Sequence, residues 1–569
     1  MSTTAAADAR FARLAAEEWA WRLGEFPQLA TSIGDASHDD RLERVDAASR
    51  AARLARWHET RAALAAIPVA EMSAAARIDR AVYENQLHGL ITAIESHADR
   101  MPLNSDSSFH GPLVDLCDAQ PLRDAADYRR YLARLADIPR FMDEHVALMR
   151  EGLATGYTVP QVVLEGRDQP LAAIAGLADA AATPFWKPFA AFPPGVPADA
   201  HDALRAQARR VIDEQVLPAY RALLAFLRET YVPGARRTTA ACDLPDGDAF
   251  YAAQIRHYTT LDVSADEIHE RGRVEVARIL AEMEDVKRDA GFDGDLQAFL
   301  QFLRSDPQFY ARTPHELLAH ASWIAKRVDG LLPRFFGVLP RQPYGVAPVP
   351  DEIAPFYTTG RYVPAPRPTG FSGMYWVNTH ALESRALYTL PALTLHEAVP
   401  GHHLQIALAA ERADQPAFRR HSFVDAFGEG WALYAEHLGH EMGVYLTPYE
   451  QFGRLTYEMW RAARLVVDTG LHARSWSRDD ARAYLLAHTA LSAHEVATEV
   501  DRYISWPGQA LSYKIGEIRI RELRAHAEQR LGAAFDLRAF HDAVLALGSV
   551  PLGVLTEQVH AWIAARLAS

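Results

Sequence analysis

A proline-rich segment between Pro340 and Gly370 is the feature that most constrains how this chain can fold. Its eight prolines remove backbone donors and clash with preceding carbonyl groups, so the segment cannot form a continuous helix. Helical periodicity dominates the sequence before it and returns from Leu390 to the end. Directly after the prolines, the aromatic stretch Gly373–Thr379 is the best strand candidate. The sequence therefore predicts a mainly α protein with a small sheet near residue 375.

Local signals indicate where several helices lie. Ala-, Leu-, Arg- and Glu-rich stretches predict helices at about 5–23, 47–66, 74–96 and 128–153. Prolines between 184 and 197 indicate a turn-rich connection before a further helix at about 198–228. Ser264, followed three residues later by Glu267, has the spacing of an N-terminal capping box, so we expect a long helix to begin there.

The composition indicates a folded protein that does not bind nucleic acid. Of the 569 residues, 49% are hydrophobic and 23% are charged, close to the average of globular domains. The net charge of −14 would repel a phosphate backbone, and no basic cluster interleaved with aromatic residues is present. We expect no nucleic-acid partner.

Cysteine content and hydropathy bear on the cellular compartment. The two cysteines, Cys117 and Cys242, cannot build a disulfide framework, which favours a reducing compartment. The first residues lack the basic and apolar pattern of a signal peptide, so we expect a cytoplasmic protein and leave a removed leader open. The longest nearly uncharged apolar run, 543–555, is too short and too broken to span a bilayer. We expect no membrane segment.

The segment LTLHEAVPGHHLQIAL, residues 393–408, places His396, Glu397, His402 and His403 in an otherwise apolar helical stretch. In the zinc motif HExxH, two imidazoles four residues apart lie on one helix face, and the Glu after the first His faces the metal-bound water. Here the position four residues after His396 is Pro400. A literal HExxH motif is therefore absent.

Pro400 forces the helix to widen or break, because its ring presses on the carbonyl of His396. A bulge that absorbs two residues would bring His402 into the place of the second ligand, and one that absorbs three would bring His403 there. We favour His402, with His403 as the alternative ligand or as a group beside the ligands. The other interpretation is that these are core or capping histidines, which three His and one Glu within eight residues make less plausible.

A third ligand is expected from the segment SFVDAFGEGWALYAEHLGHE, residues 422–441. Glu429 and Glu436 are seven residues apart and project from one face of a predicted helix, among aromatic and aliphatic residues. A carboxylate that faces a core needs a partner, and a divalent cation supplies one. Glu429 is therefore interpreted as a ligand and Glu436 as a group that orients an imidazole. Alternatively, both are ordinary surface acids of an amphipathic helix.

Further polar residues follow downstream. Asp468 and His472 are four residues apart on one predicted helix, which is typical of a polar stripe or of a plain surface face. Tyr513 follows a Pro-Gly turn at the start of a helix and either packs or donates to a developing oxyanion. Arg502 and Tyr503 either bind a peptide carboxylate or tie helices together.

The segments HEAVPGHHLQ (396–405) and EGWALYAE (429–436) together resemble the gluzincin metallopeptidases, in which a Glu on a second helix completes a zinc site. The second segment is similar to that of thimet-type oligopeptidases. The closest resemblance, over nearly the whole chain, is to a bacterial family known only as domain of unknown function 885. The resemblance implies a large two-lobed helical zincin-like fold with a small antiparallel sheet beside the active-site helix. It also implies one metallopeptidase-like module over 1–569, with a mostly helical N-terminal lobe at 1–250 and a catalytic lobe at 251–569.

The resemblance also implies a reaction and roles for the residues. Zn²⁺ would be held by His396, His402 and Glu429, and Glu397 would act as general base in the hydrolysis of short peptides. It implies that Tyr513 or His472 contacts the oxyanion and that Asp468 supports the metal site from behind the ligands. It also implies that the strand with Tyr375 and Asn378 pairs with the substrate. One alternative is a hydrolase of a non-peptide or peptide-like amide. Another, motivated by Pro400, is a non-catalytic helical binding protein on a decayed peptidase frame.

Overall fold

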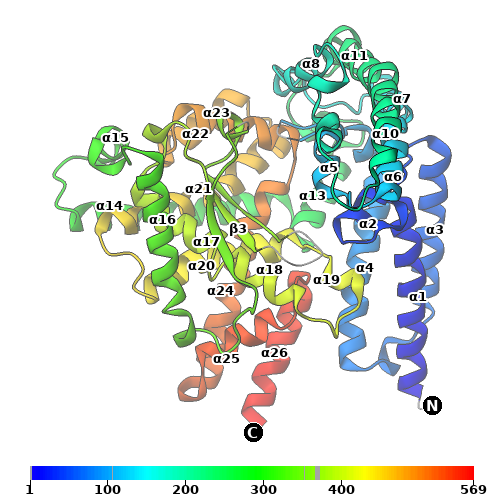
Figure 1. Ribbon diagram of the computed structural model, residues 1–569. Helices are drawn as coiled ribbons and strands as arrows, with labels where there is room; N and C mark the ends of the chain where they lie inside the picture. The colour runs from blue at the N-terminus through cyan, green and yellow to red at the C-terminus, as the bar shows by residue number, and fades with distance from the viewer. Residues whose placement is uncertain (1–2, 106, 352, 366–371, 569) are drawn as a thin grey trace. The chain divides into compact units, whose positions relative to one another are not determined.

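The computed structural model describes residues 3–105, 107–351, 353–365 and 372–568 (Figure 1). The chain forms two compact units, and the first ends at Gly247. The expected division between 1–250 and 251–569 lies next to this boundary, while the assignment of the second part as catalytic stays a prediction. The prediction of a mainly helical protein is confirmed. Part of the proline-rich segment, residues 366–371, lies outside the described residues.

The first unit is entirely helical over its described residues. Three long helices lie side by side and bury the carboxylate of Glu18, which accepts hydrogen bonds from Arg22, Trp57 and Tyr83 (Figure 1). This cluster ties the three helices together, because a buried carboxylate needs several donors. Its helices are α1 (Thr3–Glu25), α2 (Pro27–Ser32), α3 (Ala47–Ala65), α4 (Ala74–Glu95), α5 (Leu116–Ala119), α6 (Ala125–Ala136), α7 (Ile138–Thr155), α8 (Gln169–Ala175), α9 (Lys187–Ala190), α10 (His201–Val211), α11 (Leu217–Phe226) and α12 (Val232–Gly234).

The second unit contains the remaining helices and the sheet. Ser264 and Glu267 form the predicted capping box at the start of α14, which confirms that expectation. The helices of this unit are α13 (Gly247–Thr259), α14 (Ala265–Asp289), α15 (Leu296–Ser305), α16 (Pro314–Asp329), α17 (Leu390–Glu397), α18 (His402–Ala410), α19 (Ala417–Arg420), α20 (Asp425–Glu441), α21 (Pro448–Ala473), α22 (Arg478–His488), α23 (Ala493–Ser505), α24 (Ser512–Leu531), α25 (Leu537–Leu545) and α26 (Leu552–Ala568).

The sheet has three strands, β1 (Tyr344–Pro348), β2 (Gly360–Val363) and β3 (Gly373–Val377), in the order β1-β3-β2. β2 is antiparallel to β3, whereas β1 is parallel to it. The expectation of an antiparallel sheet is therefore wrong for one pair of strands. The physical reason is topological, because β3 lies between β1 and β2 and so pairs with both strands, and these two run in opposite directions.

Close helix packing sets the position of α20 within the second unit. Gly430 on α20 and Gly516 on α24 meet backbone to backbone, and a Cβ atom at Gly516 would lie 1.8 Å from the carbonyl oxygen of Ala426. Only glycine permits this approach. Along the other side of the unit, α14 packs lengthwise on α21. Over the described ranges, no helix combines the length and the apolarity that crossing a bilayer requires.

Candidate metal centre

The helix that carries His396 and Glu397 breaks at the proline. α17 ends at Glu397, and α18 begins at His402 after four residues that leave helical geometry. Trp431 donates from Nε1 to the carbonyl of Pro400 at 2.8 Å, which holds the interruption in place. A Cβ atom at Gly401 would lie 2.0 Å from the His396 carbonyl oxygen, so glycine is required there. Of the two outcomes expected at Pro400, the chain adopts the break.

Three predicted ligands converge across this break. The Nε2 atoms of His396 and His402 lie 3.5 and 3.4 Å from Oε2 of Glu429. The three ligand atoms all lie within 4.8 Å of one another, and the two imidazole rings are perpendicular. Ligands at about 2.0–2.2 Å from a tetrahedral zinc ion lie about 3.3–3.6 Å apart, so these separations fit one shared cation.

The electrostatics of the cluster also fit a cation. Oε2 of Glu429 is buried and has no hydrogen-bond partner among the described residues, although it faces two imidazole nitrogens. Burial opposes ionisation of Glu429, but His402 and His396 outweigh it and hold the pKa of that carboxyl well below 4.5. Burial likewise opposes the charged form of His396, but the facing carboxylates of Glu429 and Glu436 raise the pKa of His396 to about 9. A positive charge at this point therefore stabilises the buried carboxylates of Glu429 and Glu436.

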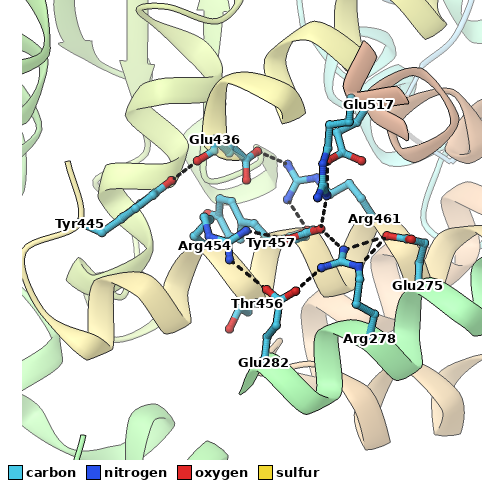
Figure 2. A network of polar contacts seen from close by, with 12 residues as sticks. Glu275, Arg278, Glu282, Glu436, Tyr445, Arg454, Thr456, Tyr457, Arg461 and Glu517 are labelled. Atoms are coloured by element: carbon cyan, nitrogen blue, oxygen red, sulfur yellow. Dashed lines mark hydrogen bonds and ion pairs between the residues drawn. The ribbon is translucent and has the colours of Figure 1, made fainter. Parts of the chain in front are cut away.

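Glu436 lies behind His396, seven residues after Glu429 on the same helix. Its Oε1 is 2.7 Å from Nδ1 of His396, so the carboxylate fixes the ring with Nε2 directed at the cluster. Glu436 is 1% exposed, and its backbone carbonyl accepts a hydrogen bond from Tyr445 (Figure 2). Arg461 approaches the same carboxylate at 3.9 Å. This is the carboxylate–imidazole arrangement that orients metal-binding histidines.

Glu397 is fixed by the sheet. Its Oε2 accepts a hydrogen bond of 2.8 Å from the backbone N–H of Tyr362 on β2. Because β2 pairs with β3 along one side only, this N–H belongs to the outer edge of the sheet. The contact positions one carboxylate oxygen, and the residue directly precedes the break that separates His396 from His402. The side chain is 8% exposed.

His403 is not part of the cluster, so neither its role as alternative ligand nor its placement beside the ligands holds. Its Nδ1 lies 3.0 Å from the hydroxyl of Tyr362, and its ring packs on Tyr344. Consecutive residues on a helix point about 100° apart, so when His402 faces Glu429 its neighbour turns to the sheet. Burial lowers the pKa of His403 to about 4.

The strand residues expected to bind a peptide are buried instead. Tyr375 lies in the central strand, is 0% exposed and contacts Thr394 through its hydroxyl. Asn378 is also fully buried and donates to the carbonyls of Ala354, Tyr357 and Thr358. A strand with neighbours on both sides has no free edge, so the expected role of these two residues in substrate binding is wrong.

His472 and Asp468 are also internal. His472 is fully buried, and its Nε2 lies 2.9 Å from the carbonyl of Tyr503, to which it donates. Asp468 accepts hydrogen bonds from the hydroxyl of Tyr251 and the backbone N–H of Gly508, and burial raises its pKa to about 7. These contacts connect α21 with α13 and with the turn before α24. The expected oxyanion role of His472 and metal-supporting role of Asp468 are wrong.

Tyr513 lies one helical turn before Gly516, where α24 meets α20 beside Glu429. Its hydroxyl accepts a hydrogen bond of 3.3 Å from Arg502, which also donates to Gln509. Arginine has no acceptor, so the phenolic proton of Tyr513 does not point back at it. Tyr503 is 1% exposed and accepts from Arg464 and Trp460, so it holds side chains rather than substrate.

Sequence reasoning missed two arginines and a strand. Arg461 and Arg464 lie three residues apart on α21, and both are buried. Their signal was a pair of arginines within the apolar stretch around Trp460 of a long helix. The contact between Tyr362 and Glu397 carried no signal, because a backbone N–H donor cannot be recognised from residue type.

The comparisons with known proteins identify the family of the chain. A family model described as a bacterial protein of unknown function, DUF885, matches residues 27–559. The chain belongs to the DUF885 family. This DUF885 protein matches none of the curated proteins.

Two solved structures share the fold of this DUF885 protein. A candidate lipoprotein from Colwellia psychrerythraea is 26% identical with a TM-score of 0.89, covering 99% of this chain and 100% of that one. A candidate lipoprotein of unknown function from Shewanella oneidensis is 19% identical with a TM-score of 0.73, covering 97% and 99%.

Proposed function

We propose that this DUF885 protein is a zinc-dependent hydrolase that cleaves amide bonds of short peptides. The observation that carries the proposal is the convergence of His396, His402 and Glu429 on one point. Two carboxylates beside this group add support: Glu397 follows the first ligand directly, and Glu436 orients it. Two imidazoles and one carboxylate are a ligand set of catalytic zinc, which keeps a fourth position for water. The resemblance to gluzincins and their two-lobed fold is part of this proposal.

Each residue of the site has its own role in the proposed hydrolysis. A zinc ion held by His396, His402 and Glu429 would polarise the scissile carbonyl and lower the pKa of bound water. Glu397, with Oε2 held by Tyr362, takes the proton of the water and delivers it to the leaving amine. Tyr513 directs its hydroxyl proton to the developing oxyanion while its oxygen accepts from Arg502.

The outer edge of β2 is the place where an extended peptide would pair. The N–H of Tyr362 on this edge strand is already bonded to Glu397, so a peptide would pair with the remaining main-chain groups of the edge and its amide bond would lie near the base. This replaces the central strand β3, which the sequence pattern favoured.

Metal content tests the proposal. We expect one zinc per chain in protein purified without chelator, and loss of that zinc in His396→Ala, His402→Ala and Glu429→Ala. His403→Ala is the matched control, because the adjacent imidazole faces the sheet and its removal should leave the zinc in place. Failure of the wild-type protein to bind zinc, even after zinc is added, would refute the proposal.

Activity is tested separately on the zinc-loaded protein. A mixed peptide library should be cleaved by the wild type and left intact by Glu397→Gln, which keeps the zinc ligands but removes the base. Cleavage at equal rates by both proteins would show that Glu397 is not the base.

The cellular location and the absence of a nucleic-acid partner stay predictions. Both structural neighbours are described as candidate lipoproteins, which makes an extracytoplasmic location the alternative to a cytoplasmic one. Fractionation of the native host decides between them.

A further inference from the structure

Arg461 is a buried cation without a strong acceptor. It is 5% exposed on α21, and its Nε has no hydrogen-bond partner among the described residues. Its two polar contacts are long: Nη1 lies 3.5 Å from the carbonyl oxygen of Tyr457, and Nη2 lies 3.9 Å from Oε1 of Glu436 (Figure 2). That oxygen of Glu436 already accepts from His396. A guanidinium group has five donors and is costly to bury without acceptors. The guanidinium group of Arg461 therefore keeps a donor available for an anion.

Arg464, three residues along the same helix face, also has one donor without an acceptor in the described part of the chain. Its Nε and Nη2 donate to Tyr503 and Glu499, while Nη1 is buried and has no partner in the described part of the chain. Glu499 also faces Arg502 at 3.6 Å, so one carboxylate serves two guanidinium groups. The positive charge at this point exceeds the negative charge that faces it at close range.

Aromatic rings join the two arginines to the catalytic side of the unit. The guanidinium carbons of Arg461 and Arg464 lie 4.4 and 4.5 Å from the ring of Trp460, which is partly exposed. They lie 6.0 and 4.4 Å from the ring of Tyr513, the proposed oxyanion donor. Stacked guanidinium groups keep their N–H edges free for a planar carboxylate.

We propose that Arg461 and Arg464 bind the C-terminal carboxylate of the substrate, so that the enzyme removes residues from the C-terminal end of peptides. This rests on the proposed function and names its substrate class. An extended peptide that pairs with β2 carries its own carboxylate beyond the scissile bond, and Tyr513, the proposed oxyanion donor, packs against both arginines. Hydrolysis consumes one water: the scissile C–N bond breaks, the carbonyl carbon gains the hydroxyl group of the water, and the amine of the released C-terminal fragment gains its proton.

Three matched peptides test the inference on the zinc-loaded protein. The first is an N-acetylated hexapeptide with a free C-terminal carboxylate, the second is the same peptide as a C-terminal amide, and the third is an amide that ends in Glu. We expect kcat/KM for the free acid to exceed that for the plain amide by about 100-fold, since two charge-assisted hydrogen bonds are lost. The product masses should show release from the C-terminus.

Arg461→Met and Arg464→Met should reduce the preference for the free acid towards unity, measured as the ratio of kcat/KM for the acid to kcat/KM for the amide, while the zinc is retained. Arg461→Lys keeps the charge but loses the bidentate geometry of the guanidinium group, so its preference for the free acid should be intermediate. This variant tests the inference if the Met variants do not fold. Arg474→Met is the control, an exposed arginine at the end of the same helix that pairs with Asp266.

The outcomes separate this inference from the proposed function. Equal cleavage of the acid and the amide, equal cleavage of the Glu-ending amide and the free acid, or release from the N-terminus would each overturn it. If the wild type cleaves no peptide, the proposed function fails, and peptide binding to zinc-loaded Glu397→Gln still tests the role of the two arginines. There the free acid should bind at least about ten-fold more tightly than the amide, and equal binding would overturn the inference.

Discussion

At the residue scale, His396 is held between two carboxylates with different tasks. Glu429 faces the Nε2 atoms of both His396 and His402, whereas Glu436 faces Nδ1 on the other side of the His396 ring. The two acids are seven residues apart on one helix, so a single helix supplies both the proposed ligand and the group that orients the imidazole. Removal of either should therefore have different consequences.

We expect Glu436→Gln to bind zinc about 10–100-fold more weakly than the wild type and not to lose it outright, because only the orientation and basicity of His396 suffer. Competition with a chromogenic chelator measures the affinity. Glu441→Gln is the control, a partly exposed acid on the same helix that pairs with Arg524. An unchanged affinity in Glu436→Gln would contradict the role of Glu436.

At the scale of the elements, the site depends on how closely α20 and α24 approach. Glu429 precedes Gly430, whose Cα atom touches Gly516 on α24, and Tyr513 lies one turn away on that helix. The contact between these glycines thus sets the separation of a predicted ligand and the predicted oxyanion donor.

Gly516→Ala should push α20 and α24 apart, because the new methyl group would meet the carbonyl of Ala426. We expect a loss of about 1–3 kcal/mol in the free energy of unfolding together with weaker zinc binding. Urea unfolding and chelator competition measure the two effects. Gly553→Ala is the matched control in α26, where a Cβ atom meets nothing within 4 Å, and should be neutral or slightly stabilising.

At the scale of the whole molecule, a buried charge network links three long helices of the second unit. Lys514 of α24 is 0% exposed and lies 2.8, 2.9 and 3.1 Å from Glu458, Glu517 and Glu275. Glu458 of α21 also accepts from Arg454 and Arg278, the second of which reaches it from α14. Stability of this unit therefore depends on charge as well as on apolar burial.

Lys514→Met should cost about 3–5 kcal/mol, because it leaves carboxylates buried without their cation. Burial opposes ionisation of Glu458, but Lys514, Arg454 and Arg278 hold its pKa well below 4.5. Since this pKa is depressed in the folded state, the stabilisation is complete above pH 4.5 and is lost as the pH falls below it. Urea unfolding between pH 7 and pH 3 should show a steep loss in the wild type and a shallower one in Glu458→Gln. Equal slopes in both proteins would contradict the assignment.

The sequence by itself determined the features that depend on near neighbours along the chain. Helical periodicity, the cap at Ser264 and the interruption at Pro400 follow from local sterics and hydrogen bonds. The residues gathered in the cluster, His396, His402 and Glu429, were recognisable because charged groups in an apolar helix need partners.

Only the tertiary structure decided which of the other polar residues face the site. Tyr375, His472 and Tyr503 are chemically suited to catalysis, yet long-range packing buries each of them against another element. Elements far apart in the sequence also decide the direction of β1 and the edge position of β2. The same holds for the contact between Arg461 and Glu436. Residue type and spacing fix what a side chain can do, whereas its partners follow from burial and from the close approach of helices, which no local pattern contains.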